Sequence, residues 1–468
     1  MMLNPYRYFD PDPTIRKLAT ELYLSVKELP LVCPHGHVDP RLLADDTPFP
    51  DPANLIIIPD HYIFRMLYSQ GVRLETLGIA PKNGEDYEQD SRKIWQVFAD
   101  HYYLFRGTPT AGWLQQEFEE VFGVSRALDS SSAMDIYDQI ATKLTTPEFR
   151  PRALFERFNI EVLCTTDAVT DDLDGHRRIN DDDWDGVVRP TFRPDSVVNI
   201  LAPAWKSEIE KLSDLAGQRI SCFGDYVAAL ESRRQDFKSL GATATDHGVF
   251  SPYARELDGS EVEALFQRAL AGRDVGEDEA KAFTGHMLME FARMSVDDGL
   301  VMQLHTGSCR NHNTSFFELF GADMGCDIPV ATEYTRNLQP LLARYGNQEN
   351  FTLVLFTLDE STYSRELAPL AGHYPCVRLG PPWWFQDSRE GMTRFRQRVT
   401  ETCGIYNTAG FNDDTRAFPS IPARHDVARR IDANFLARLV AEHVLQEEEA
   451  AEMIVDLAYN LAKKTYRL

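Results

Sequence analysis

The chain has 468 residues, enough for one large domain with insertions or for two or three domains. Hydrophobic residues make up 43% of the chain and aromatic residues 11%, and these globular values exclude a disordered protein. The formal net charge of −24 argues against nucleic acid and anionic membrane surfaces as partners, because both require a cationic footprint. An anionic small molecule would have to be held by local arginines acting against that field.

Cysteine usage and the first residues bear on the compartment. The seven cysteines are dispersed without a Cys-x-x-Cys pair, which is typical of reduced thiols. The first ten residues lack a basic region followed by an apolar stretch, so no signal peptide is predicted. The longest wholly apolar runs are far too short to span a bilayer. We therefore expect a soluble, cytoplasmic protein, and the sequence leaves open whether it forms a homo-oligomer.

Eight short β-rich apolar runs recur along the chain. They lie at 31–34, 160–165, 187–192, 242–245, 300–304, 352–358, 375–379 and 408–411. Most are nearly continuous in apolar residues, as strands buried on both faces are. Amphipathic, charge-rich stretches such as 223–240 and 426–444 lie between them. This spacing of βα units predicts an α/β fold, a (β/α)8 barrel of the TIM type, with a doubly wound open sheet as the alternative.

Two gaps between the runs are too long for ordinary crossovers. Residues 38–159 contain helix-like stretches at 60–70, 91–105, 112–122 and 133–143. This region is therefore predicted to be a helical insertion between the first and second strands. Residues 251–295 are predicted to be a smaller helical insertion within the barrel. The barrel itself would comprise residues 1–37 and 160–468, and the tail after Gln446 reads as helical.

Two histidines close the first run. His35 and His37 are two residues apart, so in a strand their side chains project to the same side and could bind one divalent metal ion. Asp414, at the end of the eighth run, would add an oxygen to a ligand set that suits zinc or manganese, and His305 is a fourth candidate. The alternative for each histidine is a buried, hydrogen-bonded ring. No lysine follows the central runs, which favours a single ion over a pair bridged by a carbamylated lysine.

Charged residues follow several other runs. Asp246 could orient a metal ligand or act as a base, and its alternative is a helix N-cap. Arg193, Arg310 and Arg416 lie just beyond predicted strand ends, where guanidinium groups could bind the carboxylate of a sugar acid in bidentate fashion. The alternative for Arg193 is a structural salt bridge to Asp195.

Aromatic residues complete the candidate set. Tyr62 could donate or relay a proton and His61 could bind a hydroxyl group, although the sequence alone favours a capped amphipathic helix as the explanation of both. Trp383 and Trp384 follow the seventh run and would either wall the pocket, stacking on a sugar ring, or belong to the core. Glycine-rich phosphate loops and Ser-His-Asp elbows are absent, which excludes nucleotide-dependent and serine-hydrolase functions.

These motifs together resemble one family. The chain contains, in order, Pro-His-Gly-His, Asp-His-Tyr-x-x-Arg, Cys-Thr-Thr-Asp, Arg-Pro-Asp, Asp-His, His-x-Gly-x-x-Arg-Asn-x-Asn, Trp-Trp-Phe and Asp-Thr-Arg. From about residue 30 to residue 426 it resembles the uronate isomerase family, also called glucuronate isomerase, of the amidohydrolase superfamily. The family usually has Asp-Pro after its Thr-Thr-Asp, whereas Ala168 and Val169 stand here, which leaves any role of Asp167 open.

The resemblance implies reversible aldose–ketose conversion of hexuronates, glucuronate to fructuronate and galacturonate to tagaturonate, with one divalent metal ion. It implies that His35, His37 and Asp414 hold the metal. Residues implied to line the active site are Tyr62, Asp246, His305, Arg310 and Arg416, with His61 and Arg193 as further members.

The implied reaction assigns work to these residues. A metal polarising the sugar oxygens would stabilise an enediolate. Asp414 or a close partner would take the C2 proton, with Tyr62 or a bound water serving the oxygens or C1. Arg310 or Arg193 would bind the C6 carboxylate, and Arg416 would favour the developing oxyanion. A mononuclear hydrolase or decarboxylase, or a uronate-binding protein without turnover, remains the alternative.

Overall fold

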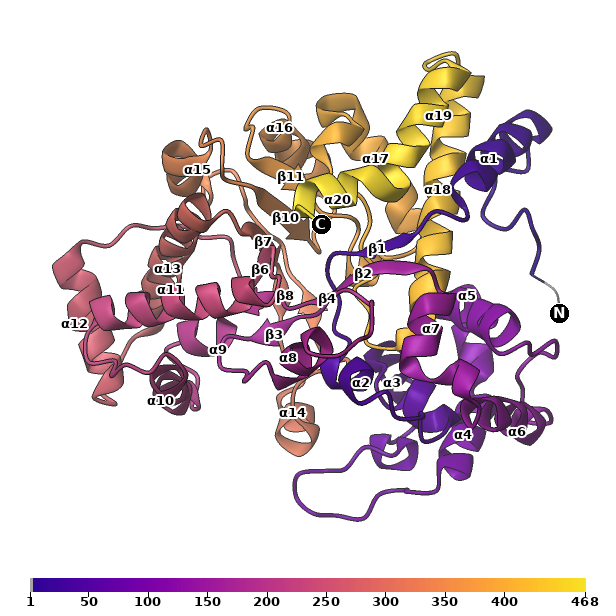
Figure 1. Cartoon of the computed structure of the whole chain (residues 1–468), viewed down its shortest axis with the longest axis horizontal. Coiled ribbons are helices and arrows are strands. Elements are labelled where there is room, and N and C mark those ends of the chain that lie inside the picture. Colours follow the sequence, from indigo (N-terminus) through magenta and orange to yellow (C-terminus); the bar gives the residue numbers. More distant parts are fainter. Residues whose placement is uncertain (1–2) are drawn as a thin grey trace.

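Short parallel strands form the centre of the molecule (Figure 1), seen in a computed structural model that describes residues 3–468. The central strands are β1 (Leu31–Cys33), β2 (Ile160–Cys164), β3 (Asp167–Ala168), β4 (Val188–Arg189), β5 (Phe192–Arg193), β6 (Ala244–Val249), β7 (Val301–Thr306), β10 (Leu353–Thr357) and β11 (Val377–Leu379). A separate antiparallel pair, β8 (Ser308–Cys309) and β9 (Ile328–Pro329), follows β7.

The strands continue from one sheet into the next. One sheet has the order β1-β2-β4 and the other β3-β5-β6-β7-β10-β11. β2 and β3 belong to one extended segment, as do β4 and β5, and backbone hydrogen bonds of 3.0 and 3.1 Å join the two segments between the sheets, from Thr165 N to Arg189 O and from Asp167 N to Thr191 O. β11 meets an eighth segment through a parallel bridge between Leu379 and Thr408.

The eighth segment returns to the first strand and closes the ring. The amide of His37 donates to the carbonyl of Thr415 at 2.9 Å, and the amide of Asp414 donates to the carbonyl of His35 at 3.3 Å. Eight parallel segments therefore surround one axis, as the sequence predicted for a barrel of the TIM type. The alternative prediction, a doubly wound open sheet, is therefore wrong.

Three of the predicted strands differ in extent from the observed ones. The fourth predicted run, 242–245, was expected to end before Asp246, but β6 continues to Val249 and pairs with β7. β7 likewise extends to Thr306 and contains His305. These polar side chains lie inside strands because the parallel ladder satisfies their backbone groups up to the barrel mouth. The predicted strand at 408–411 makes a single bridge.

Helices fill the predicted insertion between the first two strands. They are α2 (Pro40–Asp45), α3 (His61–Tyr68), α4 (Ser91–Asp100), α5 (Pro109–Gln116), α6 (Ala133–Leu144) and α7 (Pro151–Arg157). Side-chain N-caps start several of them: Asp39 caps α2, Asp60 caps α3, Asp90 caps α4 and Thr108 caps α5. Residues 38–159 are largely helical in the structure, and their status as a helical insertion between the first and second strands stays a prediction.

The remaining helices cover the barrel. They are α1 (Pro13–Val26), α8 (Asp174–Asn180), α9 (Asp195–Val198), α10 (Trp205–Leu215), α11 (Phe223–Ser239), α12 (Gly259–Leu270), α13 (Glu277–Asp298), α14 (Thr314–Phe320), α15 (Gln339–Tyr345), α16 (Ala368–Ala371), α17 (Arg389–Cys403), α18 (Ile421–Ala441), α19 (Glu447–Val455) and α20 (Leu461–Tyr466). Residues 251–295 contain α12 and most of α13, and their status as an insertion within the barrel stays a prediction; the tail is helical as predicted. In Figure 1 the first helix, α1, lies beside α18 near the chain's other end.

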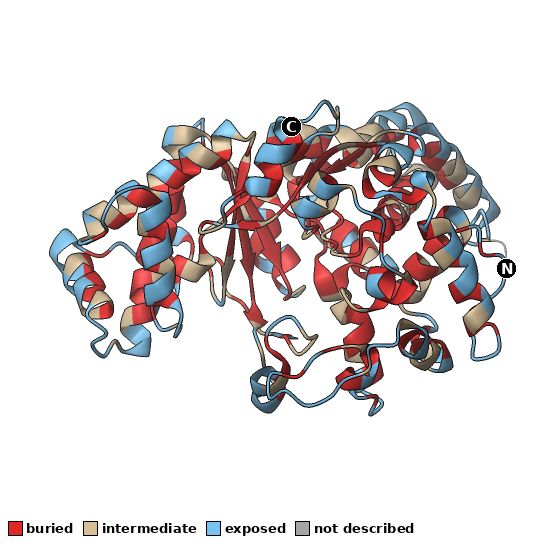
Figure 2. Ribbon diagram, turned by 60° about the horizontal axis from the view of Figure 1, so that its bottom comes forward, coloured by how far each residue is buried: buried red, intermediate tan, exposed pale blue. Residues whose placement is uncertain are grey.

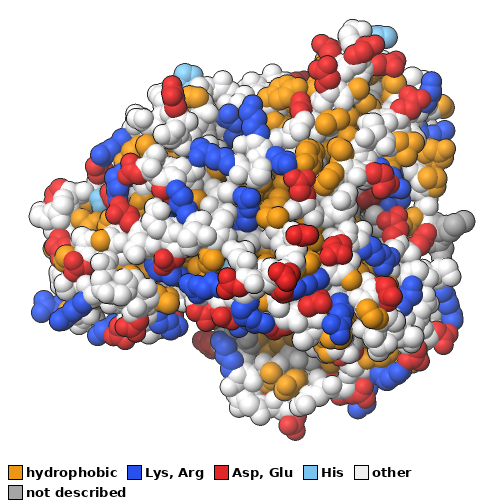
Figure 3. Space-filling view, viewed as in Figure 1, with side chains coloured by type: hydrophobic (Ala, Val, Ile, Leu, Met, Phe, Trp, Pro, Cys, Tyr) orange, Lys and Arg blue, Asp and Glu red, His pale blue; other side chains and the backbone are white. Residues whose placement is uncertain are grey.

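Burial follows the strands. Figure 2 shows the central strands buried, with exposed residues on the outer sides of the helices. On the face drawn in Figure 3, acidic and basic side chains are interspersed, so this face presents no large patch of a single charge. Within residues 3–468 no helix combines the length and the apolar character that crossing a membrane requires.

Candidate active site

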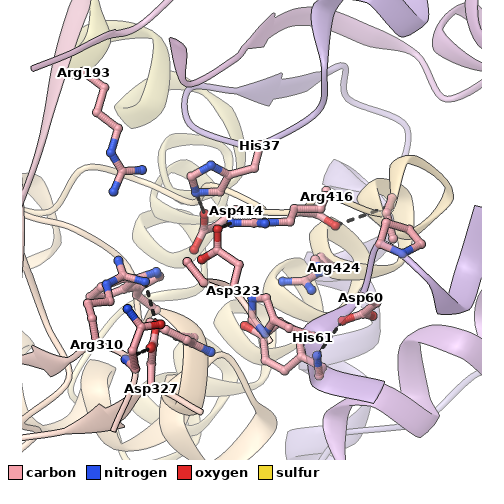
Figure 4. Close-up of a pocket in the computed structure, with 18 residues that line it drawn as sticks. His37, Asp60, His61, Arg193, Arg310, Asp323, Asp327, Asp414, Arg416 and Arg424 are labelled. Carbon is pink, nitrogen blue, oxygen red and sulfur yellow. Dashed lines mark hydrogen bonds and ion pairs between the residues drawn. The ribbon is translucent and has the colours of Figure 1, made fainter. Parts of the chain in front are cut away.

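A cavity of about 300 Å³ lies where the strand ends meet loops from the helical insertion and from the region after β7. All but three of the predicted site residues line it; the cavity-lining set is His37, His61, Tyr62, Arg193, Arg310, Trp383, Trp384, Asp414 and Arg416. Figure 4 labels six of them, which come from separate elements: His37, His61, Arg193, Arg310, Asp414 and Arg416. The other three, His35, Asp246 and His305, are buried and contact the cavity-lining residues Asp414, Arg193 and Trp383, respectively.

The predicted metal ligands come together. Asp414 Oδ1 lies 3.4 Å from His35 Nε2 and 3.2 Å from His37 Nε2, so the three candidate ligand atoms surround one point. Asp414 Oδ1 is enclosed yet accepts no hydrogen bond. Two imidazole nitrogens and a carboxylate oxygen at these separations fit a borderline divalent cation such as zinc.

The backbone conformation and the charge of Asp414 agree with a role as a metal ligand. Its φ of 45° is in the left-handed region, which side chains other than glycine seldom adopt. Such strain tends to occur at functional sites. Burial alone would raise the pKa of the Asp414 carboxyl, but its interactions with His35 and His37 hold that pKa well below the usual range. The group is therefore a carboxylate at neutral pH, as a metal ligand must be.

His305 belongs to a second buried set. Its Nδ1 atom lies 2.6 Å from Asp246 Oδ1, and its Nε2 atom is buried without a hydrogen bond. Its ring stacks on His35 with centroids 4.7 Å apart. The Asp246 carboxylate at Nδ1 fixes the orientation of the His305 ring and leaves Nε2 free for another partner. Carboxylates orient metal-binding and acid–base histidines in this way.

Asp246 links this histidine to the cavity. Its second oxygen lies 3.4 Å from Arg193 Nη1, and Arg193 also binds Asp195 at 2.8 Å. Burial would raise the pKa of Asp246, but His305 and Arg193 hold it well below its usual range. The N-cap alternative for Asp246 is wrong, since the residue lies inside β6. The salt bridge expected as an alternative for Arg193 is present, and the arginine lines the cavity as well.

Two partly exposed arginines face the cavity from other loops. Arg310 pairs with Asp327 at 2.8 Å and lies over the Trp384 ring, 5.2 Å from its centroid. Arg416 pairs with Asp323 at 3.2 Å. One carboxylate cannot occupy all five donors of a guanidinium, so each arginine retains donors for an anionic ligand. The two aspartates were missed by sequence reasoning, although both lie in a glycine-containing stretch that ends in the β8–β9 pair.

The Asp60–Tyr62 segment enters from the helical insertion. The Asp60 carboxylate accepts the Tyr62 amide at 2.8 Å and caps α3, so the capped-helix reading is correct and the segment also lines the cavity. Burial lowers the pKa of His61 to about 3, which leaves this imidazole neutral. Burial raises the pKa of Tyr62, so the phenol keeps its proton at neutral pH and is suited to donate it.

Two further residues were not predicted. Arg424, on α18, lines the cavity and pairs with Asp387 at 2.9 Å. Burial raises the pKa of Asp387 to about 7, against the effect of Arg424. A charged residue within a helix normally indicates an exposed face, and the sequence carried no sign that this one is buried. Asp167 does not line the cavity; its carboxylate accepts from Thr165 and contacts His176 at 3.2 Å.

Comparisons with known proteins show what this chain is similar to. A family model described as glucuronate isomerase matches residues 14–466. A uronate isomerase from Nostoc punctiforme is 56% identical over 468 residues, which cover 100% of this chain and 98% of the relative. The crystal structure of glucuronate isomerase from Caulobacter crescentus has a TM-score of 0.98 at 51% identity, covering 100% of this chain and 97% of that one. The uronate isomerase structure from Thermotoga maritima has a TM-score of 0.93 at 26% identity, with both chains covered completely.

Proposed function

Because the chain belongs to the glucuronate isomerase family, we propose that it interconverts D-glucuronate with D-fructuronate and D-galacturonate with D-tagaturonate. The chain is thus an aldose–ketose isomerase of uronates. The observation that carries the proposal at the level of chemistry is the convergence of His35, His37 and Asp414 at a cavity that several arginines line. A sugar acid offers what such a cavity binds, a carboxylate at one end and vicinal oxygens at the other.

The metal part of the proposal rests on the enclosed, unsatisfied Asp414 oxygen and on the donor set. We infer that His35, His37 and Asp414 hold one divalent cation, zinc or manganese. Such a cation supplies Lewis-acid polarisation of the sugar oxygens when bound. His305, whose Nε2 atom is unpaired, would approach the same oxygens or the cation itself.

Proton transfer is assigned to two groups of the cavity. Isomerisation takes a proton from C2 and returns one at C1, and it moves a second proton from the C2 hydroxyl to the C1 oxygen. We assign removal of the C2 proton to Asp414, which is ionised, and proton donation to Tyr62, which is not. Arg416 would favour negative charge on the developing enediolate oxygen.

Substrate orientation would come from the other cationic groups. Arg310 stacks on Trp384 and retains free donors, which suits it to bind the C6 carboxylate, and Arg193 is placed to assist. Trp383, Trp384 and His61 would contact the sugar carbons and hydroxyls. All seven cysteines are unpaired, which supports the proposal that the protein works in the reducing cytoplasm.

The test is turnover of glucuronate in deuterated water, with the ketose detected by coupled reduction. A proton-transferring isomerase forms fructuronate with deuterium in the product. A hydrolase or decarboxylase of the same superfamily would leave glucuronate unconverted to ketose, and a binding protein would bind the sugar without forming product. Either result would refute the proposed function.

A further inference from the structure

Arg424 occupies a junction between three separate parts of the chain. Its guanidinium donates to Asp387 Oδ2 at 2.9 Å, in the loop after β11, and to the carbonyl of Asp413 at 3.0 Å, directly before Asp414. The same group lies 4.0 Å from the centroid of the Trp113 ring and 5.3 Å from that of Tyr62. One side chain from α18 thus touches the loop after β11, the eighth barrel segment and the helical insertion.

The ion pair between Arg424 and Asp387 is buried but incompletely hydrogen-bonded. The side chains of Arg424 and Asp387 are 3% and 5% exposed, yet Arg424 Nε and Asp387 Oδ1 are both buried without a hydrogen bond. Desolvation makes a buried ion pair a weak source of stability even when every atom is satisfied. By comparison, the Arg396 guanidinium on α17 donates to both carboxylate oxygens of Asp432 on α18, at 2.7 and 3.0 Å. The Arg424 pair is therefore less completely hydrogen-bonded than the Arg396 pair, and it differs from that pair in that its arginine lines the cavity.

We propose that Arg424, held in place by Asp387, is a positioning residue that fixes the Tyr62 phenol relative to Asp414 during isomerisation. The inference rests on the proposed function, which gives Tyr62 and Asp414 the two proton-transfer roles. Arg424 is too enclosed to serve as a main substrate ligand, because almost none of its side chain is exposed.

The contacts show how one residue can hold both groups. Tyr62 is fixed on one edge by Trp113, with ring centroids 5.7 Å apart, and by the guanidinium that lies over both rings. The hydrogen bond from Arg424 to the Asp413 carbonyl fixes the peptide that precedes the left-handed Asp414. Because proton transfer depends steeply on position, a shift of about 1 Å between the two groups is expected to cost up to about a hundredfold in rate.

The charge of Arg424 acts on the same groups. Burial raises the pKa of Tyr62, and Arg424 is the strongest neighbouring charge that opposes this rise. The same guanidinium also opposes the effect of burial on the pKa of Asp60, which caps the helix that carries Tyr62. The arginine therefore acts on this helix through packing and through charge.

A kinetic double-mutant cycle tests the proposal. Arg424→Met and Arg424→Lys are prepared in the parent chain and in a Tyr62→Phe background, and kcat and KM for glucuronate are measured. We expect Arg424→Met to lower kcat by about 30-fold or more with KM changed less than about threefold, because the loss falls on the proton-transfer step. In the Tyr62→Phe background the same change should cost less than about threefold, since the group it positions is gone. Arg424→Lys should lie between, because lysine keeps the charge but lacks the planar fork.

Arg396→Met is the matched control, since it breaks a buried ion pair between α17 and α18 whose two residues do not line the cavity. It should lower the melting temperature while its effect on kcat stays the same with and without Tyr62. A loss for Arg424→Met that is equally large in both backgrounds, or no loss, would overturn the proposal.

A second variant covers a failure of Arg424→Met to fold. Asp387→Asn leaves the arginine in place and removes its anchor, and the same dependence on Tyr62 is expected. Equal losses in both backgrounds for this variant would likewise refute the positioning role. Turnover by the parent chain tests the proposed function separately, so failure of one hypothesis is distinguishable from failure of the other.

Discussion

Neutralising Asp246 should strongly lower the activity of the isomerase while the shape of its cavity is kept. Asp246 bonds His305 at 2.6 Å and lies 3.4 Å from Arg193, and all three groups are shielded from bulk water to a large degree. In Asp246→Asn the side chain keeps its size but loses the charge that fixes the imidazole and faces the guanidinium. A hydrogen bond to a charged group contributes about 1.5–3 kcal/mol, and each 1.36 kcal/mol is a factor of ten in rate. The expected loss of kcat/KM is therefore about 10- to 150-fold.

The measurement is steady-state turnover of glucuronate with coupled ketose reduction, together with the content of bound metal. Asp167→Asn is a suitable control, because Asp167 is also a buried carboxylate beside a histidine, His176, but does not line the cavity. It should cost stability without a comparable loss of kcat/KM. If Asp246→Asn retained more than about half of parental kcat/KM, the expectation that Asp246 supports catalysis by fixing His305 and facing Arg193 would be wrong.

Three further results are expected. Removal of divalent ions by a chelator should abolish turnover, and zinc or manganese should restore it; full activity in a metal-free preparation would refute the metal site. Arg310→Met should raise KM for uronates at least about tenfold, whereas the surface control Arg344→Met should not, and equal turnover of neutral glucose by the parent would contradict the carboxylate role. Burial raises the pKa of Glu117 to about 8 from 4.5, so the folded state retains a proton that the unfolded state loses, and stability falls as pH rises between these values. Glu117→Gln should remove that slope in urea unfolding at pH 5 and 8, with a gain at pH 8 of at most about 5 kcal/mol.

The barrel could be predicted because its strands are buried on both faces. Runs such as those that became β7 and β10 are almost entirely apolar, and their number and spacing matched eight βα units. The ends of the strands could not be predicted in the same way. Asp246 and His305 look like loop residues by composition, yet they extend the ladder because their backbone groups pair with the next strand while their side chains bond each other.

Those residues of the candidate site that belong to a short sequence motif could be predicted. His35 and His37 show their shared direction in their spacing, and an Asp in the motif after the eighth run marks Asp414. Arg424 and Asp387 carry no such signal. Each is a charged residue in a stretch that the sequence alone would place at the surface. Only the packing of α18 against the barrel mouth brings Arg424 to the cavity and into contact with Asp387. Contacts between residues so distant in the sequence are set by tertiary structure alone.

The place where the ring closes joins the fold to the chemistry. The hydrogen bonds that connect the last barrel segment to the first run between Asp414 and His35 and between His37 and Thr415, so the candidate metal ligands are themselves the residues of the closing contact. A cation held by His35, His37 and Asp414 would therefore cross-link the two ends of the barrel. More than 370 residues separate the two histidines from Asp414 in the sequence, so the unfolded chain does not hold the three side chains together. A cation that binds only the folded protein would therefore add its binding free energy to the stability of the fold. The strained backbone of Asp414 is tolerable for the same reason, since its conformation is imposed from both sides, by the first strand and by the contact of Arg424 with the preceding carbonyl.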